Sequence, residues 1–152
     1  MKITVLTVGK KHDSAIADAI NEYISRLNRV IKTEWQIIAP SGKDNLLARD
    51  EESTVILNKI KQKNTVWLLD ERGDQIDSPS LAQSLTKAQF KAEDLVIIIG
   101  GAYGVNDSVR ERADFVWSLS KLIFPHQLVR LIMAEQLYRA TEITRGSNYH
   151  HL

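Results

Sequence analysis

Strand-like and helix-like segments alternate along almost the whole sequence, and this alternation constrains the fold most. Short runs rich in β-branched and aromatic residues predict strands at residues 3–8, 35–38, 65–69, 95–99 and 115–119. Apolar residues at helical spacing predict helices at 14–27, 46–61, from 78 onward, at 107–112 and at 125–143. Strands that alternate with helices favour an α/β fold in which helices flank a mostly parallel sheet.

Local signals add detail to this outline. Leu95–Ile99 is apolar throughout, so we expect it to be buried on both faces. Asp70–Gly73 is expected to turn the chain away from the third strand. Ser78 and Pro79 have the serine cap and first-turn proline typical of a helix start. No repeat, linker or low-complexity stretch interrupts the chain, so a single domain over residues 1–152 is the simplest organisation.

Composition excludes several classes of protein. The sequence has no cysteine, which excludes disulfide scaffolds, thiolate zinc sites and cysteine nucleophiles. Its longest apolar run is far too short to cross a bilayer, and Met1–Val5 lacks the apolar stretch of a signal peptide. We therefore expect a cytoplasmic protein with no membrane or metal partner. The net charge is only +1, so any contact with RNA has to come from local groups or from a dimer surface.

Two segments are candidates for ligand binding. Ile99–Gly104 contains three glycines and follows the most buried strand, at the edge of the sheet where α/β proteins bind ligands. A tight turn between buried elements would explain these glycines equally well. Ser120–Phe124 is an apolar loop with little turn chemistry. Such a loop either packs into the core or wraps a flat apolar group such as adenine.

The last helix and the tail carry polar candidates. Glu135 and Arg139 lie four residues apart and can pair on one helix face, which is usually a structural role. Arg130 and Arg139 have the guanidinium groups that suit phosphates. Tyr149 and His150 can stack on a base and donate hydrogen bonds, although a frayed end is the usual behaviour of terminal residues.

Motifs from end to end of the chain resemble one known family. The matching segments are Met1–Val5 with Gly9–Lys10, Leu69–Asp70 before Gly73, Ile99–Gly101 with Gly104, Ser118–Arg130, Ala134–Ala140, and Gly146 with Tyr149–His150. Together they resemble the RlmH family of SPOUT-class 23S rRNA pseudouridine N3-methyltransferases.

The resemblance implies a fold and an activity that the residue patterns do not show. It implies an α/β-knot whose C-terminal helix passes through a loop as a trefoil knot, which general topology rules would exclude. It also implies a homodimer with S-adenosyl-L-methionine bound within the knot. The implied reaction is methylation of N3 of a pseudouridine in 23S rRNA of the large subunit, on assembled ribosomes.

Site residues follow by the same resemblance. The cofactor pocket is expected to be lined by Leu69, Gly100, Leu119, Ser120, Lys121, Leu122, Ile123 and Phe124. Arg139, Tyr149 and His150 are the candidates for catalysis, by positioning the base and handling its proton. We expect a composite site, in which one subunit holds the cofactor and the other helps to hold RNA.

Two other functions remain open. A nucleotide-binding module without catalysis would also place a ligand at the glycine turn. A small hydrolase using His126 and Asp70 is a weaker alternative, because the sequence has no nucleophile elbow and no matched metal-ligand spacing.

Overall fold

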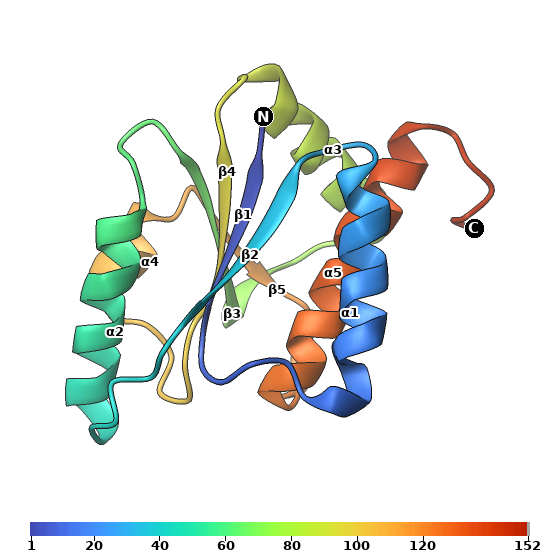
Figure 1. The fold of residues 1–152 in the computed structure, drawn as a ribbon. Helices are drawn as coiled ribbons and strands as arrows, with labels where there is room; N and C mark the ends of the chain where they lie inside the picture. Colours follow the sequence, from blue (N-terminus) through green and yellow to red (C-terminus); the bar gives the residue numbers. More distant parts are fainter. Residues whose placement is uncertain (152) are drawn as a thin grey trace.

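Five parallel strands form one sheet, and helices cover both of its faces (Figure 1). The computed structural model describes residues 1–151. Its elements in chain order are β1 (Ile3–Val8), α1 (Ser14–Asn28), β2 (Thr33–Ile38), α2 (Asn45–Lys59), β3 (Thr65–Gln75), α3 (Ser78–Phe90), β4 (Leu95–Ile99), α4 (Asp107–Arg112), β5 (Phe115–Ser118) and α5 (His126–Thr144). The predicted α/β class with a parallel sheet is confirmed.

The strand order β2-β1-β4-β3-β5 creates two crevices at the carboxyl edge of the sheet. Helices α1, α3 and α5 cover one face, whereas α2 and α4 cover the other (Figure 1). The loop after β4 therefore leads to one face, while the loops after its neighbours β1 and β3 lead to the opposite face. Diverging loops of this kind mark the points where open α/β sheets bind ligands. One crevice lies between β4 and β3, and the other lies between β4 and β1.

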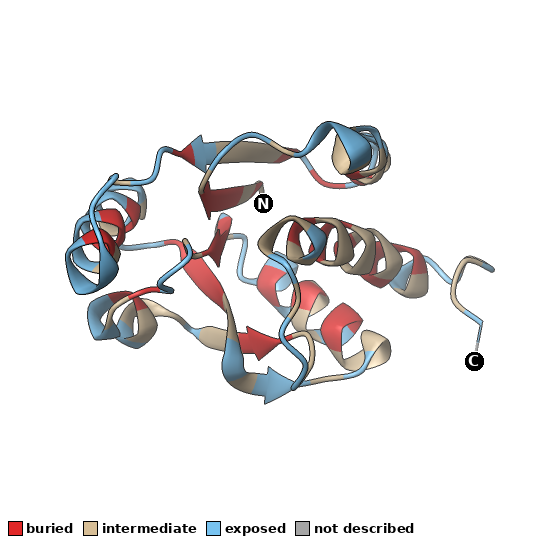
Figure 2. Cartoon of the chain, turned by 90° about the horizontal axis from the view of Figure 1, so that it is seen from below, coloured by how far each residue is buried: buried red, intermediate tan, exposed pale blue. Residues whose placement is uncertain are grey.

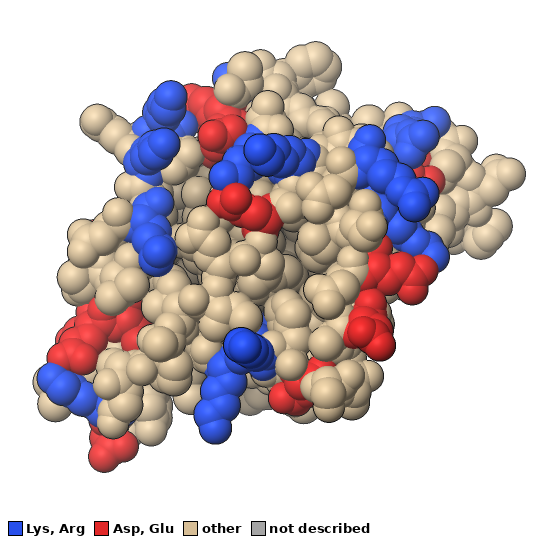
Figure 3. Space-filling view, in the orientation of Figure 1, with Lys and Arg blue, Asp and Glu red and all other residues tan. Residues whose placement is uncertain are grey.

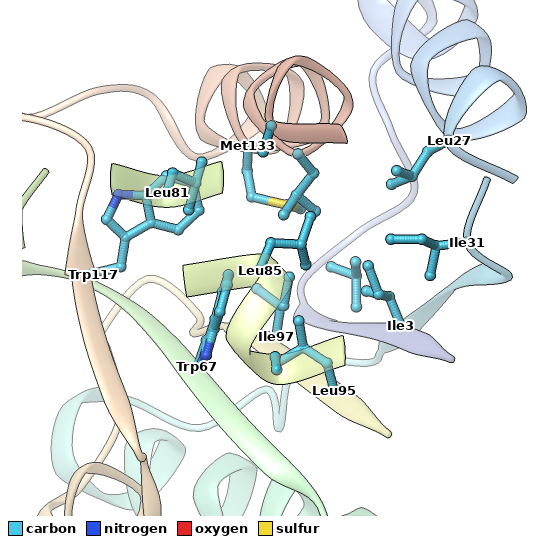
Figure 4. Close-up of a cluster of buried hydrophobic side chains, with 14 of the residues drawn as sticks. Ile3, Leu27, Ile31, Trp67, Leu81, Leu85, Leu95, Ile97, Trp117 and Met133 are labelled. Carbon is cyan, nitrogen blue, oxygen red and sulfur yellow. The ribbon is translucent and has the colours of Figure 1, made fainter. Parts of the chain in front are cut away.

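Alternation along the strands divides the core between the two faces. Ile97 in β4 and Trp67 in β3 face α3 and α5, where Leu85 and Met133 pack against them (Figure 4). The intervening residues of the same strands, such as Ile98, face α2 and α4. All five residues of β4 are buried, as its apolar sequence predicts. Figure 2 shows the buried positions concentrated on the strands and on the inward sides of the helices.

Two local predictions are wrong. Asp70–Gly73 does not end the third strand: β3 continues to Gln75, and the register with β5 shifts between Leu69 and Asp74. The segment bulges out and returns because Gly73 lies against the β5 backbone, where a Cβ would come within 2.5 Å of the Val116 carbonyl oxygen. The cap of α3 is Asp77 rather than the expected serine, since its carboxylate accepts from the Ser80 amide at 2.8 Å.

The surface carries mixed charge. On the face shown in Figure 3, lysine and arginine form several separate groups with aspartate and glutamate between them. This distribution agrees with a net charge of +1 and offers local basic groups rather than one basic field. Within residues 1–151, no helix combines the length and apolar character needed to cross a membrane.

Candidate functional site

A cleft of about 570 Å³ lies at the carboxyl ends of β3, β4 and β5. Its walls come from the β3 bulge, the glycine turn after β4 and the apolar loop before α5. Seven of the eight expected cofactor residues line it: Leu69, Gly100, Leu119, Ser120, Leu122, Ile123 and Phe124. Lys121 belongs to the same loop but does not line the cleft. The structure thus brings together segments that are 50 residues apart in the chain.

The apolar loop points two aliphatic side chains out of the core. Leu122 is 71% exposed and Ile123 is 88% exposed, so the alternative of a core-packing loop is wrong for these two residues. Two hydrogen bonds hold the loop in shape: the Ser118 hydroxyl donates to the Ser120 carbonyl, and the Leu122 amide donates to the Ser120 hydroxyl, each at 3.0 Å. An ordered loop that exposes two aliphatic side chains in a cleft is suited to cover a flat apolar ligand.

The glycine turn forms the floor between β4 and α4. The Gly104 amide donates to the Gly101 carbonyl at 3.0 Å and closes the turn. A Cβ on Gly100 would lie 3.0 Å from Val105 and 3.2 Å from the Gly104 carbonyl carbon, so a larger residue would have to displace its neighbours in the turn. His126 donates from Nε2 to the Gly100 carbonyl at 2.6 Å and fixes the turn against the start of α5. These contacts give the cleft a preformed backbone surface.

Asp70 is held as an anion at the rim of the cleft. Burial raises the pKa of this carboxyl, but hydrogen bonds from Arg72 and the charge of Arg110 outweigh that effect and lower it overall. The Arg110 contact is 2.9 Å and the Arg72 contact is 3.1 Å. Because Asp70 and His126 are each engaged with other groups, the structure gives the hydrolase alternative no support.

The three catalytic candidates lie together, but at the other end of α5. Glu135 is their common partner: its Oε1 accepts from Arg139 at 2.6 and 3.0 Å and from the Tyr149 hydroxyl at 3.1 Å. Arg139 also donates to Nδ1 of His150 at 3.3 Å and lies over the Tyr149 ring at 4.9 Å. The predicted pairing of Glu135 with Arg139 is confirmed, and the tail is packed onto α5 rather than extended.

This cluster lies outside the cleft of the same chain. Thirteen residues separate Arg139 from His126, which corresponds to about 20 Å along a helix. Burial, the Tyr23 hydroxyl and the Glu135 carboxylate all raise the pKa of Tyr149, so its hydroxyl keeps its proton at neutral pH. Tyr149 can therefore donate a hydrogen bond but is a poor proton acceptor.

Arg130 does not lie where the sequence suggested. Its side chain is fully buried, so it cannot bind phosphates on the open surface. One nitrogen, Nη1, donates to the Lys10 carbonyl at 2.8 Å and to Nδ1 of His12 at 3.2 Å. Sequence reasoning missed this burial because nothing local distinguishes Arg130 from Arg139, the other arginine of α5.

Two histidines beside Arg130 predict a dependence of stability on pH. Burial, and then the charge of Arg130, lower the pKa of His12, and burial is also the main cause that lowers the pKa of His126. Below a pH of about 6.5 these histidines bind protons in the unfolded chain more readily than in the folded chain. The free energy of unfolding therefore decreases as pH falls below this value. We expect the thermal midpoint of unfolding to be lower at pH 5.5 than at pH 7.5. In His12→Gln the midpoint should change less between these two pH values. His151→Gln, at an exposed position, is the control; an unchanged difference between the two midpoints in His12→Gln would contradict the assignment.

Metal chemistry has no candidate in the described part of the chain. Residues 1–151 contain no group of three or more histidine, aspartate or glutamate side chains placed to hold a metal ion. The chemistry available at the cleft is that of backbone amides and carbonyls, apolar side chains and a few polar side chains: Asp70, Glu71, Arg72, Tyr103, Ser120 and His126.

Comparisons with known proteins give one consistent picture. Residues 1–150 match a family model described as "Predicted SPOUT methyltransferase". Proteins called "Ribosomal RNA large subunit methyltransferase H" from Geobacter metallireducens and Geotalea daltonii are 43% and 38% identical to this chain. The alignments cover 99% of this chain and 99% and 100% of those relatives. A solved structure, "a probable methylase family protein" from Haemophilus influenzae, superposes with a TM-score of 0.57 at 9% identity, covering 99% of this chain and 70% of that one, and supports the fold alone.

Proposed function

The chain belongs to the SPOUT methyltransferase family, and from this premise we propose that it methylates N3 of a pseudouridine in the 23S rRNA of assembled ribosomes. Its relatives of 43% and 38% identity carry names that state methylation of large-subunit ribosomal RNA. The observation that carries the proposal is the cleft at the carboxyl edge of the sheet, lined by the glycine turn and the apolar loop. Because the proposed substrate is the ribosome, the proposal includes a cytoplasmic location for the enzyme.

We propose S-adenosyl-L-methionine as the methyl donor, and the cleft residues fit it. Leu122 and Ile123 offer apolar surface for the adenine ring, and the backbone around Gly100 offers polar groups at close range. The cofactor supplies a methyl group on a sulfonium centre. The protein's part is to hold that centre in line with the attacking nitrogen and to exclude water, which accounts for much of the catalysis in direct displacements.

Ile123 provides the first test of this cofactor site. Replacement by alanine removes an 88% exposed side chain, so the fold loses little, but the ligand loses apolar contact. We expect affinity for S-adenosyl-L-methionine to fall about tenfold, or about 1.4 kcal/mol, by calorimetry. Phe90→Ala is the matched control, because Phe90 is 85% exposed and lies at the end of α3, outside the cleft. Equal affinities in the two variants would rule out this role of the loop.

We propose that the site is composite and the enzyme is a homodimer with the trefoil knot of its family. Arg139 lies about 20 Å along α5 from the start of the helix, and Tyr149 and His150 of the tail pack beside it, so the three are too far away to serve the cleft of their own chain. A second copy can bring its tail to the first copy's cleft. There Arg139 would stabilise the negative charge that develops on the base, and Tyr149 would stack on it or donate to it.

The decisive experiment is methylation of purified ribosomes with labelled S-adenosyl-L-methionine, followed by mapping of the modified base. Label at N3 of a single pseudouridine in 23S rRNA is the expected result. The nucleotide-binding module predicts cofactor binding without transfer. Absence of label from ribosomes by a protein that binds the cofactor would therefore favour that alternative.

A further inference from the structure

A second cleft lies in the crevice on the other side of β4. Its volume is about 400 Å³, and it lies between the loop after β1 and the loop after β4. It shares Gly101–Tyr103 and His126 with the cofactor cleft, so only the glycine turn and one imidazole separate the two. A ligand here would lie next to a ligand in the first cleft.

Two buried charged groups at this second cleft each have polar atoms without a partner among the described residues. Arg130 is fully buried, and its Nε and Nη2 have no hydrogen-bond acceptor within residues 1–151. These two nitrogens form one edge of the guanidinium, the fork that binds two acceptor positions at once. Glu52 is 5% exposed; its Oε1 accepts from the Ser41 amide at 3.1 Å, but its Oε2 has no donor among the described residues. Buried groups of this kind normally have partners, because an unpaired buried polar group lowers the stability of the fold by roughly 1–3 kcal/mol, and a charged one by more.

A glycine lies over each of these unpaired atoms. A Cβ on Gly9 would be 2.9 Å from Nη2 of Arg130, and a Cβ on Gly101 would be 2.6 Å from Oε2 of Glu52. Gly9 also has a φ of +142°, a conformation that residues with a side chain rarely adopt. The two loops therefore pass close to the charged groups, and Arg130 and Glu52 line the same cleft.

This pair of groups selects the chemistry of the ligand. An anion would bind the Arg130 fork but would be repelled by the carboxylates of Glu52 and Asp13, which also lines the cleft. A neutral imide satisfies both groups, because a carbonyl oxygen accepts from Arg130 while the neighbouring N–H donates to Glu52. Lys10 and Lys43 are exposed at the rim, where they can meet phosphates that flank such a base in RNA.

We propose that the cleft between β1 and β4 holds the uracil-type target base, with Arg130 binding a ring carbonyl and Glu52 accepting the imide proton. This proposal rests on the proposed function. The N–H proton passes to Oε2 of Glu52, and the ring nitrogen uses the freed electron pair to bond the methyl carbon. The methyl–sulfur bond breaks in the same displacement and leaves a neutral thioether, after which Glu52 releases its proton to water.

Glu52→Gln tests the proton acceptor and Glu51→Gln is its matched control. Glu51 is the preceding residue, but it is exposed and pairs with Lys43. A general base contributes roughly 10²–10⁴-fold, so we expect at least about a 100-fold lower kcat for Glu52→Gln, with unchanged affinity for S-adenosyl-L-methionine. Its residual rate should rise with pH, because hydroxide then has to remove the imide proton, whereas Glu51→Gln should keep the wild-type rate and pH profile. A wild-type kcat in Glu52→Gln would overturn the assignment. So would a lower kcat whose pH profile is the same as that of the wild type.

A binding measurement on the wild-type dimer tests the pocket without any variant. Pseudouridine 5′-monophosphate should shift the amide resonances of Gly9, Lys10 and Gly101, and cytidine 5′-monophosphate should not, because cytosine lacks the imide N–H. Equal shifts with both nucleotides, or none, would overturn the proposal even if ribosomes are methylated.

A large loss of S-adenosyl-L-methionine affinity in Glu52→Gln would instead assign the cleft to the amino-acid end of the cofactor. Failure of wild-type protein to methylate ribosomes would count against the proposed function, while specific shifts would still support the pocket.

Discussion

Removing the residues after Gly146 is expected to lower the rate of ribosome methylation about 100-fold while leaving the affinity for S-adenosyl-L-methionine unchanged. The deletion takes away Tyr149 and His150, whose stacking and hydrogen bonds contribute roughly 1–3 kcal/mol for each base contact. It leaves the cofactor cleft and the pair formed by Glu135 and Arg139 in place. Methylation at the full rate by the shortened chain would show that the tail is only a packed end.

A mixed dimer separates a site shared between two copies from a site within one chain. The shortened chain keeps an intact cofactor cleft, and a Gly100→Val chain keeps an intact tail but has a blocked turn. Each alone is expected to methylate ribosomes at least about 100-fold more slowly than the wild type. Co-expressed with different affinity tags, the mixed dimer should regain activity, because one copy's cleft meets the other copy's tail. No recovery in a purified mixed dimer would place the tail and the cleft of one active site in the same chain.

The parts of the fold that sequence predicted are those with a strong local signal. Composition alone indicates where three segments lie in the fold: the apolar run of β4, the glycines after it and the apolar loop at 119–124. Their meeting in one cleft follows from the rule that the carboxyl ends of parallel strands share an edge. The knot, the dimer and the roles of individual site residues stay predictions, because they depend on the family resemblance rather than on a local pattern.

Except for the cap of α3, which is shifted by one residue, the errors and omissions share one physical cause, which is contact between distant segments. Asp70–Gly73 reads locally as a turn, but Gly73 packs on the backbone of β5 and returns the strand to the sheet. Glu52 lies in the charged stretch 49–52 and has no feature that marks it as buried; the loop after β2, through Ser41, and the loop after β4, through Gly101, lie against it. Arg130 likewise becomes buried through Gly9, more than a hundred residues earlier in the chain. A single sequence contains no direct signal for such pairs.

Arg130→Met is expected to raise the free energy of unfolding while it abolishes methylation. The native guanidinium is fully buried, and within residues 1–151 it uses only Nη1 in hydrogen bonds, while Nε and Nη2 have no acceptor. Burial lowers the pKa of Arg130, and the charge of Asp13 only partly offsets this effect. Replacing buried ionic groups by apolar residues of similar size often stabilises proteins by about 1–4 kcal/mol. Methionine has a similar length and enough flexibility to fill the space.

The stability of this variant decides why Arg130 is buried. At fixed protein concentration and pH 7.5, we expect the thermal midpoint to rise by about 2–8 °C. Arg145→Met, which removes a 59% exposed arginine paired with Glu142, should stay within about 0.5 kcal/mol of the wild type. If Arg130→Met raises stability and abolishes activity, the native arginine lowers stability but is needed for function. This is the pattern expected of a group that binds a ligand. A lower midpoint in Arg130→Met would mean that the contacts with Lys10 and His12 outweigh the buried charge, and Arg130 would then be a structural residue that holds the loop after β1 onto α5.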